Sequence, residues 1–105
     1  MFIELTDETF RGHAASNSLV LLFTSPWCAG CKKVKKALES IALKQEDQDR
    51  AIQFAQIDIS RSPDTPAGLG VISLPTVIIF KEGKEVSRFS GSIRPKALTV
   101  EVERL

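Results

Sequence analysis

This 105-residue chain has few cysteines and aromatic residues. It has no long apolar run and nearly equal numbers of basic and acidic side chains. With 14 basic and 13 acidic side chains, the net charge is +1, which excludes broad electrostatic capture of nucleic acid or of an anionic membrane. The longest uninterrupted apolar stretch, Leu19–Phe23, is far too short to cross a bilayer. Two cysteines cannot supply the disulfide framework of a small secreted protein.

The chain is nevertheless long enough to bury a core without disulfides or metal. Its composition, 43% hydrophobic and 26% charged, is typical of a globular domain. We therefore expect residues 1–105 to form one domain with a radius of gyration of about 13 Å. The amino terminus carries acids at Glu4, Asp7 and Glu8 and lacks the basic lead of a secretory signal, so we expect a cytoplasmic location.

The amino-terminal third predicts a strand, a helix and a second strand. Phe2–Leu5 is a short strand candidate. Thr6 is placed to cap a helix that runs to about Ala15, with the acidic residues after Thr6 facing the positive end of that helix. Leu19–Phe23 is apolar at every position, as expected of a strand covered on both faces, and Pro26 interrupts strand pairing beyond it.

A longer helix and a second buried strand follow. The helix is predicted to start at Cys28 and to end in the polar run Gln45–Arg50. Ala51–Ile59 is predicted to be a strand because its large apolar residues recur at short intervals. The apolar face of the helix consists of Val34, Ala37, Leu38, Ile41 and Ala42.

The last third predicts a loop, a hairpin and a final helix. Ser60–Gly70 contains two prolines and two glycines, so we expect a loop with at most a short helix starting near Pro66. Thr76–Phe80 and Glu85–Ser90 flank a turn that contains Gly83, which predicts an antiparallel hairpin. Pro95 is suited to the first turn of a helix bearing Leu98, Val102 and Leu105. The alternation of strands and helices before this hairpin predicts right-handed crossovers and parallel pairing, hence a mixed α/β sheet.

The two cysteines are separated by two residues, as Cys28 and Cys31, at the predicted start of a helix. This spacing permits the short Cα separation of a disulfide. The free N–H groups and positive dipole end of a helix amino terminus favour a thiolate over a thiol. The pair is therefore suited to reversible disulfide formation.

A helical wheel separates the two sulfurs. Lysines follow Cys28 at positions 32, 33, 35 and 36, and Lys32 lies one turn beyond Cys28 on the same side. Cys31 lies nearer the apolar face of the helix. This geometry nominates Cys28 as the exposed, attacking sulfur and Cys31 as the shielded, resolving sulfur.

Three other interpretations of these residues are open. The cysteines could be half of a metal site shared between two chains, although His13, on a different helix, is the only other strong ligand candidate. They could instead be core cysteines without redox use, in a domain that only binds partners. The lysine run resembles a nucleic-acid patch, but lysines opposite an apolar stripe are more typical of a solvated helix face.

The motif Trp27-Cys28-Ala29-Gly30-Cys31-Lys32, followed later by Leu74-Pro75-Thr76, resembles the thioredoxin family. Phe80–Gly83 and Gly91 also match the late hairpin of that family and the glycine after it. The resemblance covers essentially the whole chain. It implies a five-stranded mixed sheet of order 1-3-2-4-5 with helices on both faces, and a cis peptide bond before Pro75 that faces the cysteines.

The resemblance also implies a function, the reduction of protein disulfides by thiol–disulfide exchange. Cys28 would attack the substrate disulfide, Cys31 would resolve the mixed disulfide, and no cofactor would be bound other than the Cys28–Cys31 disulfide. The electron donor would be a thioredoxin reductase of the NADPH- and flavin-dependent type, with ferredoxin-linked reductases or a dedicated partner as alternatives. We expect a monomer. The residues implied to receive the substrate are Trp27, Ala29, Gly30, Leu74, Pro75 and Gly91.

The chain departs from the family pattern in three respects. The family usually has a buried Asp on the central strand, where this chain has Leu22, and often a Lys near it, where this chain has Gln56. We therefore expect Cys31 to resolve mixed disulfides more slowly than in a member with the Asp. Ala29-Gly30 replaces the common Gly-Pro, which predicts a less strongly reducing pair. Thr24 stands where a second Trp is frequent, so the floor of the site should be less bulky.

Overall fold

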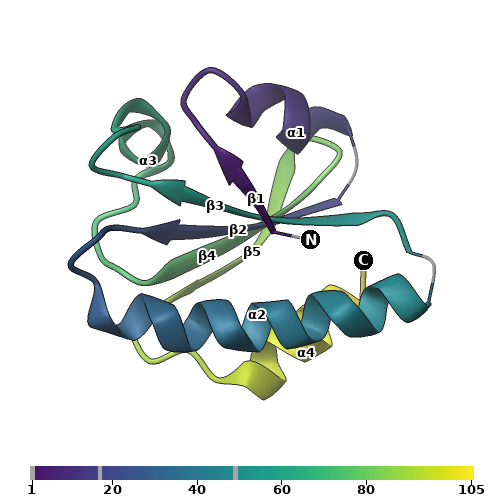
Figure 1. The fold of residues 1–105 in the computed structure, drawn as a ribbon. Coiled ribbons are helices and arrows are strands. Elements are labelled where there is room, and N and C mark those ends of the chain that lie inside the picture. Colours follow the sequence, from purple (N-terminus) through teal and green to yellow (C-terminus); the bar gives the residue numbers. More distant parts are fainter. Residues whose placement is uncertain (1, 17, 49) are drawn as a thin grey trace.

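In residues 2–16, 18–48 and 50–105, which the computed structural model describes, five strands form one mixed sheet flanked by four helices (Figure 1). The strand order is β1-β3-β2-β4-β5, which confirms the predicted topology. The radius of gyration is 12.4 Å, close to the expected value. In chain order the elements are β1 Phe2–Leu5, α1 Phe10–Ser16, β2 Ser18–Thr24, α2 Ala29–Asp47, β3 Ile52–Asp58, α3 Asp64–Leu69, β4 Thr76–Lys81, β5 Lys84–Ser90 and α4 Pro95–Glu103.

The central strand β2 is covered on both faces, as its uniform apolar sequence predicts. It pairs in parallel with β3 and antiparallel with β4, and each residue of Leu19–Phe23 is 0% exposed. Leu19, Leu21 and Phe23 face the layer of α1 and α3, whereas Val20 and Leu22 face the layer of α2 and α4. This alternation places Leu22 beneath α2, the helix that carries the cysteines.

The first helix starts later than predicted. The side chain of Thr6 accepts none of the described helix N–H groups, since its Oγ1 lies 3.4 Å from Oγ1 of Thr9. The carbonyl of Thr6 accepts bonds from the N–H groups of Thr9 (3.1 Å) and Phe10 (3.0 Å) in a turn before the helix. Helix α1 then begins at Phe10 and has no acidic residue in its first turn. The carboxylate of Asp7, predicted to face this helix, is instead occupied by α3.

Asp7 determines where α3 begins. Its carboxylate accepts bonds from the N–H groups of Asp64 (3.1 Å) and Thr65 (2.8 Å) and from Oγ1 of Thr65 (2.8 Å). The helix therefore starts at Asp64, two residues before the predicted start at Pro66, and Pro66 occupies a first-turn position where no N–H is needed. Burial raises the pKa of the Asp7 carboxyl, but the bonds from Thr65 and Asp64 outweigh burial, so the pKa lies below its usual value.

The carboxyl-terminal part confirms the hairpin and shortens the final helix. Glu82 (φ 52°) and Gly83 (φ 84°) form the turn between β4 and β5, where both central residues need positive φ. Helix α4 begins at Pro95 and ends at Glu103, so Leu105 lies beyond the helix and packs against the core from the chain end. The described helices include none long and apolar enough to cross a membrane.

Candidate active site

The turn between β2 and α2 positions the first cysteine. β2 ends at Thr24, and Pro26 follows where a continuing strand would need a backbone donor. The N–H of Cys28 donates to the carbonyl of Ser25 at 3.2 Å, which closes the turn. Cys28 is the N-cap of α2, with extended backbone angles (φ −87°, ψ 101°) that direct the chain into the helix.

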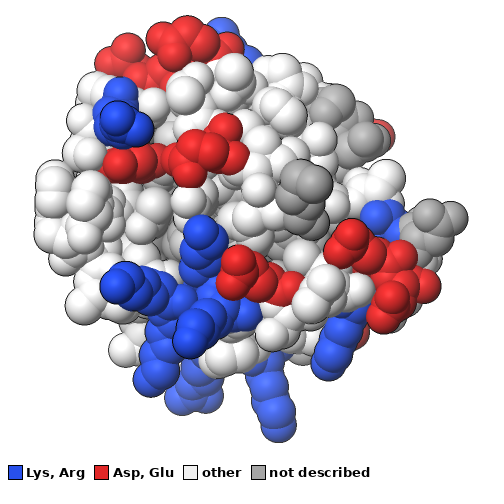
Figure 2. Space-filling model, in the orientation of Figure 1, with Lys and Arg blue, Asp and Glu red and all other residues white. Residues whose placement is uncertain are grey.

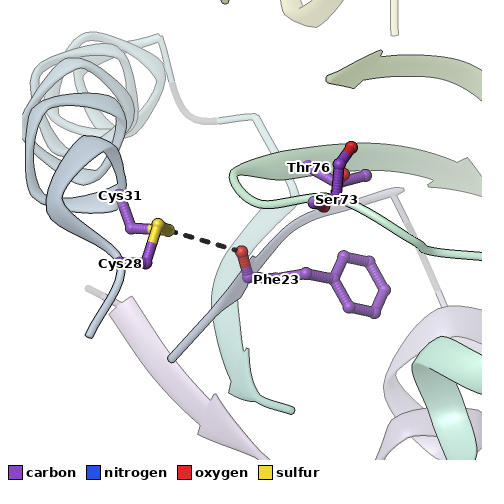
Figure 3. The surroundings of a disulfide bond; sticks show 5 residues. All are labelled: Phe23, Cys28, Cys31, Ser73 and Thr76. Atoms are coloured by element: carbon purple, nitrogen blue, oxygen red, sulfur yellow. Dashed lines mark hydrogen bonds between the residues drawn. A yellow bond between two sulfur atoms is a disulfide. The ribbon is translucent and has the colours of Figure 1, made fainter. Parts of the chain in front are cut away.

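Cys28 and Cys31 form a disulfide across the first turn of α2, with their Cα atoms 5.5 Å apart (Figure 3). Cys31 is only 3% exposed, because its position on α2 faces the sheet, whereas Cys28 is half-buried at the helix end. Sγ of Cys31 lies 3.8 Å from the carbonyl oxygen of Phe23 at the end of β2. In the dithiol form, this carbonyl is placed to accept the S–H of Cys31.

The amino terminus of α2 has no anionic cap. The side chain of Cys28 makes no capping hydrogen bond, and the first turn contains no acidic residue. The exposed lysines at 32, 33 and 36 and the half-buried Lys35 add positive charge to the same end of the helix. Figure 2 shows Lys and Arg gathered over the amino-terminal half of α2. These N–H groups and charges favour a thiolate at Cys28 after reduction.

The loop that enters β4 faces the disulfide. The Leu74–Pro75 peptide bond is cis, as the resemblance implied. The Pro75 ring lies against the helix start, since a β-carbon on Gly30 would sit 3.5 Å from Cδ of Pro75. Gly91, whose φ of 75° favours glycine, donates its N–H to the carbonyl of Pro75 at 3.3 Å. Gly30, Pro75 and Gly91 are thus adjacent, although they come from three distant segments.

The rim of this region is exposed and partly apolar. Trp27 is 74% exposed, Ala29 is exposed, and Leu74 is half-buried. Ile72, which is 97% exposed in the loop before Leu74, was not predicted as a site residue. An apolar residue in a proline-flanked loop was the only sequence signal for it, and such residues are common enough to carry little information.

Comparisons with known proteins agree with this geometry. The profile of the thioredoxin family, described as "Thioredoxin", matches residues 1–104. A thioredoxin from Listeria monocytogenes is 35% identical over 96 residues, which span 91% of this chain and 89% of the relative. The chain belongs to the thioredoxin family.

Two further relatives extend the comparison within the thioredoxin family. The crystal structure of mitochondrial thioredoxin 3 from Saccharomyces cerevisiae in its oxidised form superposes with a TM-score of 0.86 at 27% identity, covering 99% of this chain and 95% of that one. A bifunctional thioredoxin reductase/thioredoxin from Mycobacterium leprae is 37% identical over 98 residues, which span 91% of this chain and 21% of that protein.

Membership establishes the chemistry of the cysteine pair. The protein is a thiol–disulfide oxidoreductase that transfers electrons and reduces protein disulfides. Its redox group is the Cys28–Cys31 disulfide, and the thioredoxin family needs no bound cofactor for this reaction.

Leu22 and Gln56, two of the positions that depart from the thioredoxin pattern, are neighbours in the sheet. Leu22 on β2 pairs with Gln56 on β3, and Gln56 pairs with Glu4 on β1. All three side chains lie on the face of the sheet that carries α2, where Nε2 of Gln56 donates to Oε1 of Glu4 at 2.7 Å. Leu22 is completely buried beneath Cys31. Its side chain is apolar, so this position supplies no carboxylate.

A cleft of about 420 Å³ opens beside the disulfide on this face. Both sulfur-bearing residues line it, as do Leu22, Gln56 and the half-buried Thr24. Lys32 was predicted to lie beside Cys28, but Glu4, Asp58 and Arg61 were not predicted as site residues, although sheet order 1-3-2 together with strand alternation would have placed Glu4 next to Gln56. The charged residues that line the cleft are Glu4, Lys32, Lys35, Asp58 and Arg61.

His13 lies away from this cleft. It is half-buried on α1, and its Nδ1 lies 3.2 Å from Oε1 of Gln53. Among the residues with described positions, no three His, Cys, Asp or Glu side chains are grouped closely enough to hold a metal ion.

Proposed function

We propose that Cys28 is the attacking cysteine and Cys31 the resolving cysteine. The observation that carries the assignment is their difference in burial: Cys31 is 3% exposed, and Cys28 stands at the uncapped end of α2. In the dithiol form, the Cys28 thiolate attacks one sulfur of a substrate disulfide, and the other substrate sulfur leaves with the electron pair. Cys31 then loses its proton and attacks Sγ of Cys28. The substrate sulfur that was bonded to Cys28 leaves with the electron pair of that bond. The substrate has then gained two electrons, and the protein has regained its disulfide.

The proposed substrate surface surrounds Cys28. Trp27, Leu74 and Gly91 supply a shallow, largely apolar rim around the cis Pro75. Its proposed members also include Ala29 and Gly30, which lie between the cysteines. The backbone of Leu74 is proposed to pair with an extended substrate segment in the manner of an added strand. Lys32, which is exposed beside this rim, is proposed to attract acidic partners through an effect that salt weakens.

The proposed electron donor is a thioredoxin reductase of the NADPH- and flavin-dependent type. The Mycobacterium leprae relative supports this choice, because it is a bifunctional thioredoxin reductase/thioredoxin. We further propose that residues 1–105 act as one thioredoxin domain, as a monomer in the cytoplasm, with substrates that are proteins carrying accessible disulfides.

Turnover with a standard thioredoxin reductase, NADPH and insulin tests both ends of this electron path. We expect NADPH oxidation that depends on insulin and on the wild-type chain, and none with Cys28→Ser. The Cys31→Ser variant should instead accumulate a mixed disulfide that a reductant releases. If Cys31→Ser turns over normally and Cys28→Ser forms the mixed disulfide, the assignment is reversed.

The residues between the cysteines bear on the redox potential. We propose that Ala29-Gly30 makes the pair less strongly reducing than the Gly-Pro type, because the glycine leaves the turn freer. Equilibration with glutathione, followed by the fluorescence of Trp27, measures the potential without a tyrosine background, since the chain has no tyrosine. A potential equal to or below that of a Gly-Pro thioredoxin contradicts the proposal.

A second function beside the redox reaction, binding of a partner that does not depend on the thiols, is favoured by the exposure of Trp27 (74%) and Ile72 (97%). In that case the double variant Cys28→Ser/Cys31→Ser would hold its partner as tightly as the wild-type chain does.

A further inference from the structure

Resolution by Cys31 requires an acceptor for its proton. Only the thiolate is a competent nucleophile, and the low exposure of Cys31 (3%) favours the neutral thiol. Leu22, which lies on the sheet beneath α2, cannot accept a proton. The nearby carbonyl of Phe23 can hold the S–H but cannot remove the proton, because a peptide carbonyl is a very weak base. The acceptor must therefore be reached through the cleft beside the disulfide.

The cleft connects Cys31 to a carboxylate on the edge strand. Glu4 and both cysteines line the same cavity of about 420 Å³. At about 30 Å³ per molecule, a volume of this size accommodates a chain of water molecules. Glu4 points into this layer because β1 alternates: Phe2 packs with the core beneath α2, Leu5 packs on the opposite face, and Glu4 shares the side of Phe2.

Gln56 holds the Glu4 carboxylate in position. The register aligns Glu4, Gln56 and Leu22 across three neighbouring strands, and the amide of Gln56 donates to Oε1 of Glu4 at 2.7 Å. This bond occupies one carboxylate oxygen and leaves Oε2 with no partner among the hydrogen bonds of the described residues. A glutamate on an edge strand is thus held at the wall of the cleft.

The other charged groups around the cleft are weaker candidates for this role. Lys32 and Lys35 on α2 and Arg61 after β3 are cations, which stabilise nearby anions but accept no proton at neutral pH. Asp58 is a carboxylate held by two donors, since its Oδ1 accepts bonds from the N–H (2.9 Å) and Oγ (2.6 Å) of Ser60. Its other oxygen makes it the competing acceptor that the test below addresses.

We infer that Glu4 is the proton acceptor for Cys31 during resolution, acting through water in the cleft, and that Gln56 positions Glu4. The inference rests on the proposed order of attack, Cys28 first and Cys31 second. The S–H proton of Cys31 passes through water to the Glu4 carboxylate as Sγ of Cys31 bonds to Sγ of Cys28. The bond from Cys28 to the substrate sulfur breaks, and that sulfur leaves with the electron pair. Glu4 then returns the proton to solvent.

The test uses reduced protein and 5,5′-dithiobis(2-nitrobenzoate), an aromatic disulfide whose released thiolate is coloured. A first phase, dependent on reagent concentration, reports attack by Cys28, and a second phase, independent of concentration, reports resolution by Cys31. The aromatic thiol is a good leaving group without protonation, so the second phase isolates deprotonation and attack by Cys31. Absence of the first phase in the wild-type chain would contradict the proposed function, and only the second phase bears on Glu4.

Glu4→Gln should slow the second phase about tenfold at pH 7 and leave the first phase unchanged. Direct general-base catalysis is worth roughly a hundredfold or more, but bulk water provides a bypass here. As the pH rises, more of Cys31 ionises without help from the carboxylate, so the difference between the variant and wild-type rates should shrink. Glu4→Asp should restore part of the rate. The matched control is Glu39→Gln, the same change at an exposed position of α2 outside the residues that line the cleft.

Three outcomes would overturn the inference. Glu4→Gln could leave the second phase unchanged. It could slow the second phase by the same factor at every pH, which would indicate a structural role. Asp58→Asn could slow the second phase where Glu4→Gln does not, which would assign the proton to the other carboxylate of the cleft.

Discussion

The amino termini of α2 and α3 differ in what accepts the hydrogen bonds of their free N–H groups. Each follows a strand of the parallel part of the sheet, and each has N–H groups that the helix itself cannot satisfy. At α3, the carboxylate of Asp7 accepts from the N–H groups of Asp64 and Thr65. At α2, the N-cap is Cys28, which makes no side-chain capping bond, and lysines replace acids in the first turns.

The difference shows how one structural feature serves stability in one place and chemistry in another. A bound carboxylate satisfies the start of α3 permanently and ties it to the segment after β1. The start of α2 keeps its N–H groups for an anion that appears only on reduction, the thiolate of Cys28. The following predictions exchange or remove these features, beginning with the largest expected effect.

Cys28→Ser removes the reactive anion from α2 and should reduce disulfide reduction to the level of a blank without protein. Serine is a preferred N-cap in the extended backbone that Cys28 adopts, so it should offset the lost thiolate and leave the stability within about 1 kcal/mol of the reduced wild-type chain. Insulin reduction and urea unfolding under reducing conditions measure the two effects. Residual turnover in the purified variant would contradict the assignment of Cys28.

Leu22→Asp places a carboxyl group in the core beneath α2. Burying it without a cationic partner should destabilise the protein by about 3 kcal/mol, while resolution by Cys31 becomes faster at neutral pH. Urea unfolding and the second phase of the aromatic disulfide reaction measure these effects. Leu22→Asn, polar but unable to take the proton, should show the loss of stability without the faster rate. An unchanged or slower rate in Leu22→Asp would refute the prediction.

Ala29→Asp gives α2 the acid that α3 already has. The exposed carboxylate should stabilise the helix start by about 0.5 kcal/mol and, as a like charge, disfavour the thiolate of Cys28. We expect the first phase with the aromatic disulfide to be up to about tenfold slower at pH 7, because a shift of one pKa unit changes the thiolate fraction tenfold. The neutral variant Ala29→Asn is the control, and equal first-phase rates in the two variants would rule out an effect of charge.

Asp7→Asn weakens the carboxylate contact of α3 and should lower stability at neutral pH with no change in either redox phase. Because the pKa of Asp7 is lowered in the folded protein, its contribution is present above the ordinary Asp value of about 3.9. The contribution is lost as the pH falls through the folded-state pKa. Urea unfolding followed by circular dichroism should therefore show a difference between variant and wild-type chain at pH 6 that shrinks below about pH 4. A constant difference across this range would mean that the charge of Asp7 does not act.

Most elements of the fold could be predicted because their signals are local. The uniform apolar run Leu19–Phe23 predicts a central strand, and Gly83 predicts the hairpin turn. The predicted starts of α1 and α3 were wrong by a few residues, and for α3 the reason is not local. The acceptor for the N–H groups of α3 is Asp7, which lies 57 positions before Asp64, and no local pattern reveals such a bond.

The candidate site also has features that local sequence predicts and features that depend on contacts between distant segments. The spacing of Cys28 and Cys31, the lysines after them and the apolar face of α2 are periodic features, so the sequence indicates which sulfur is shielded. Ile72 and the cleft were not predicted, because exposure of a loop residue and the volume between side chains depend on how distant segments pack.

By itself, the sequence determined that two cysteines two residues apart begin a helix after a buried strand, in a chain too neutral and too poor in cysteine for the other functions considered. Only the tertiary structure decided what surrounds them. Sheet order and register bring Glu4 beside Gln56 and Leu22, and the loop with cis Pro75 against Gly30. The physical reason is range: helix periodicity and capping act within a few residues, whereas the proton path and the substrate surface are assembled by packing between segments far apart in the chain.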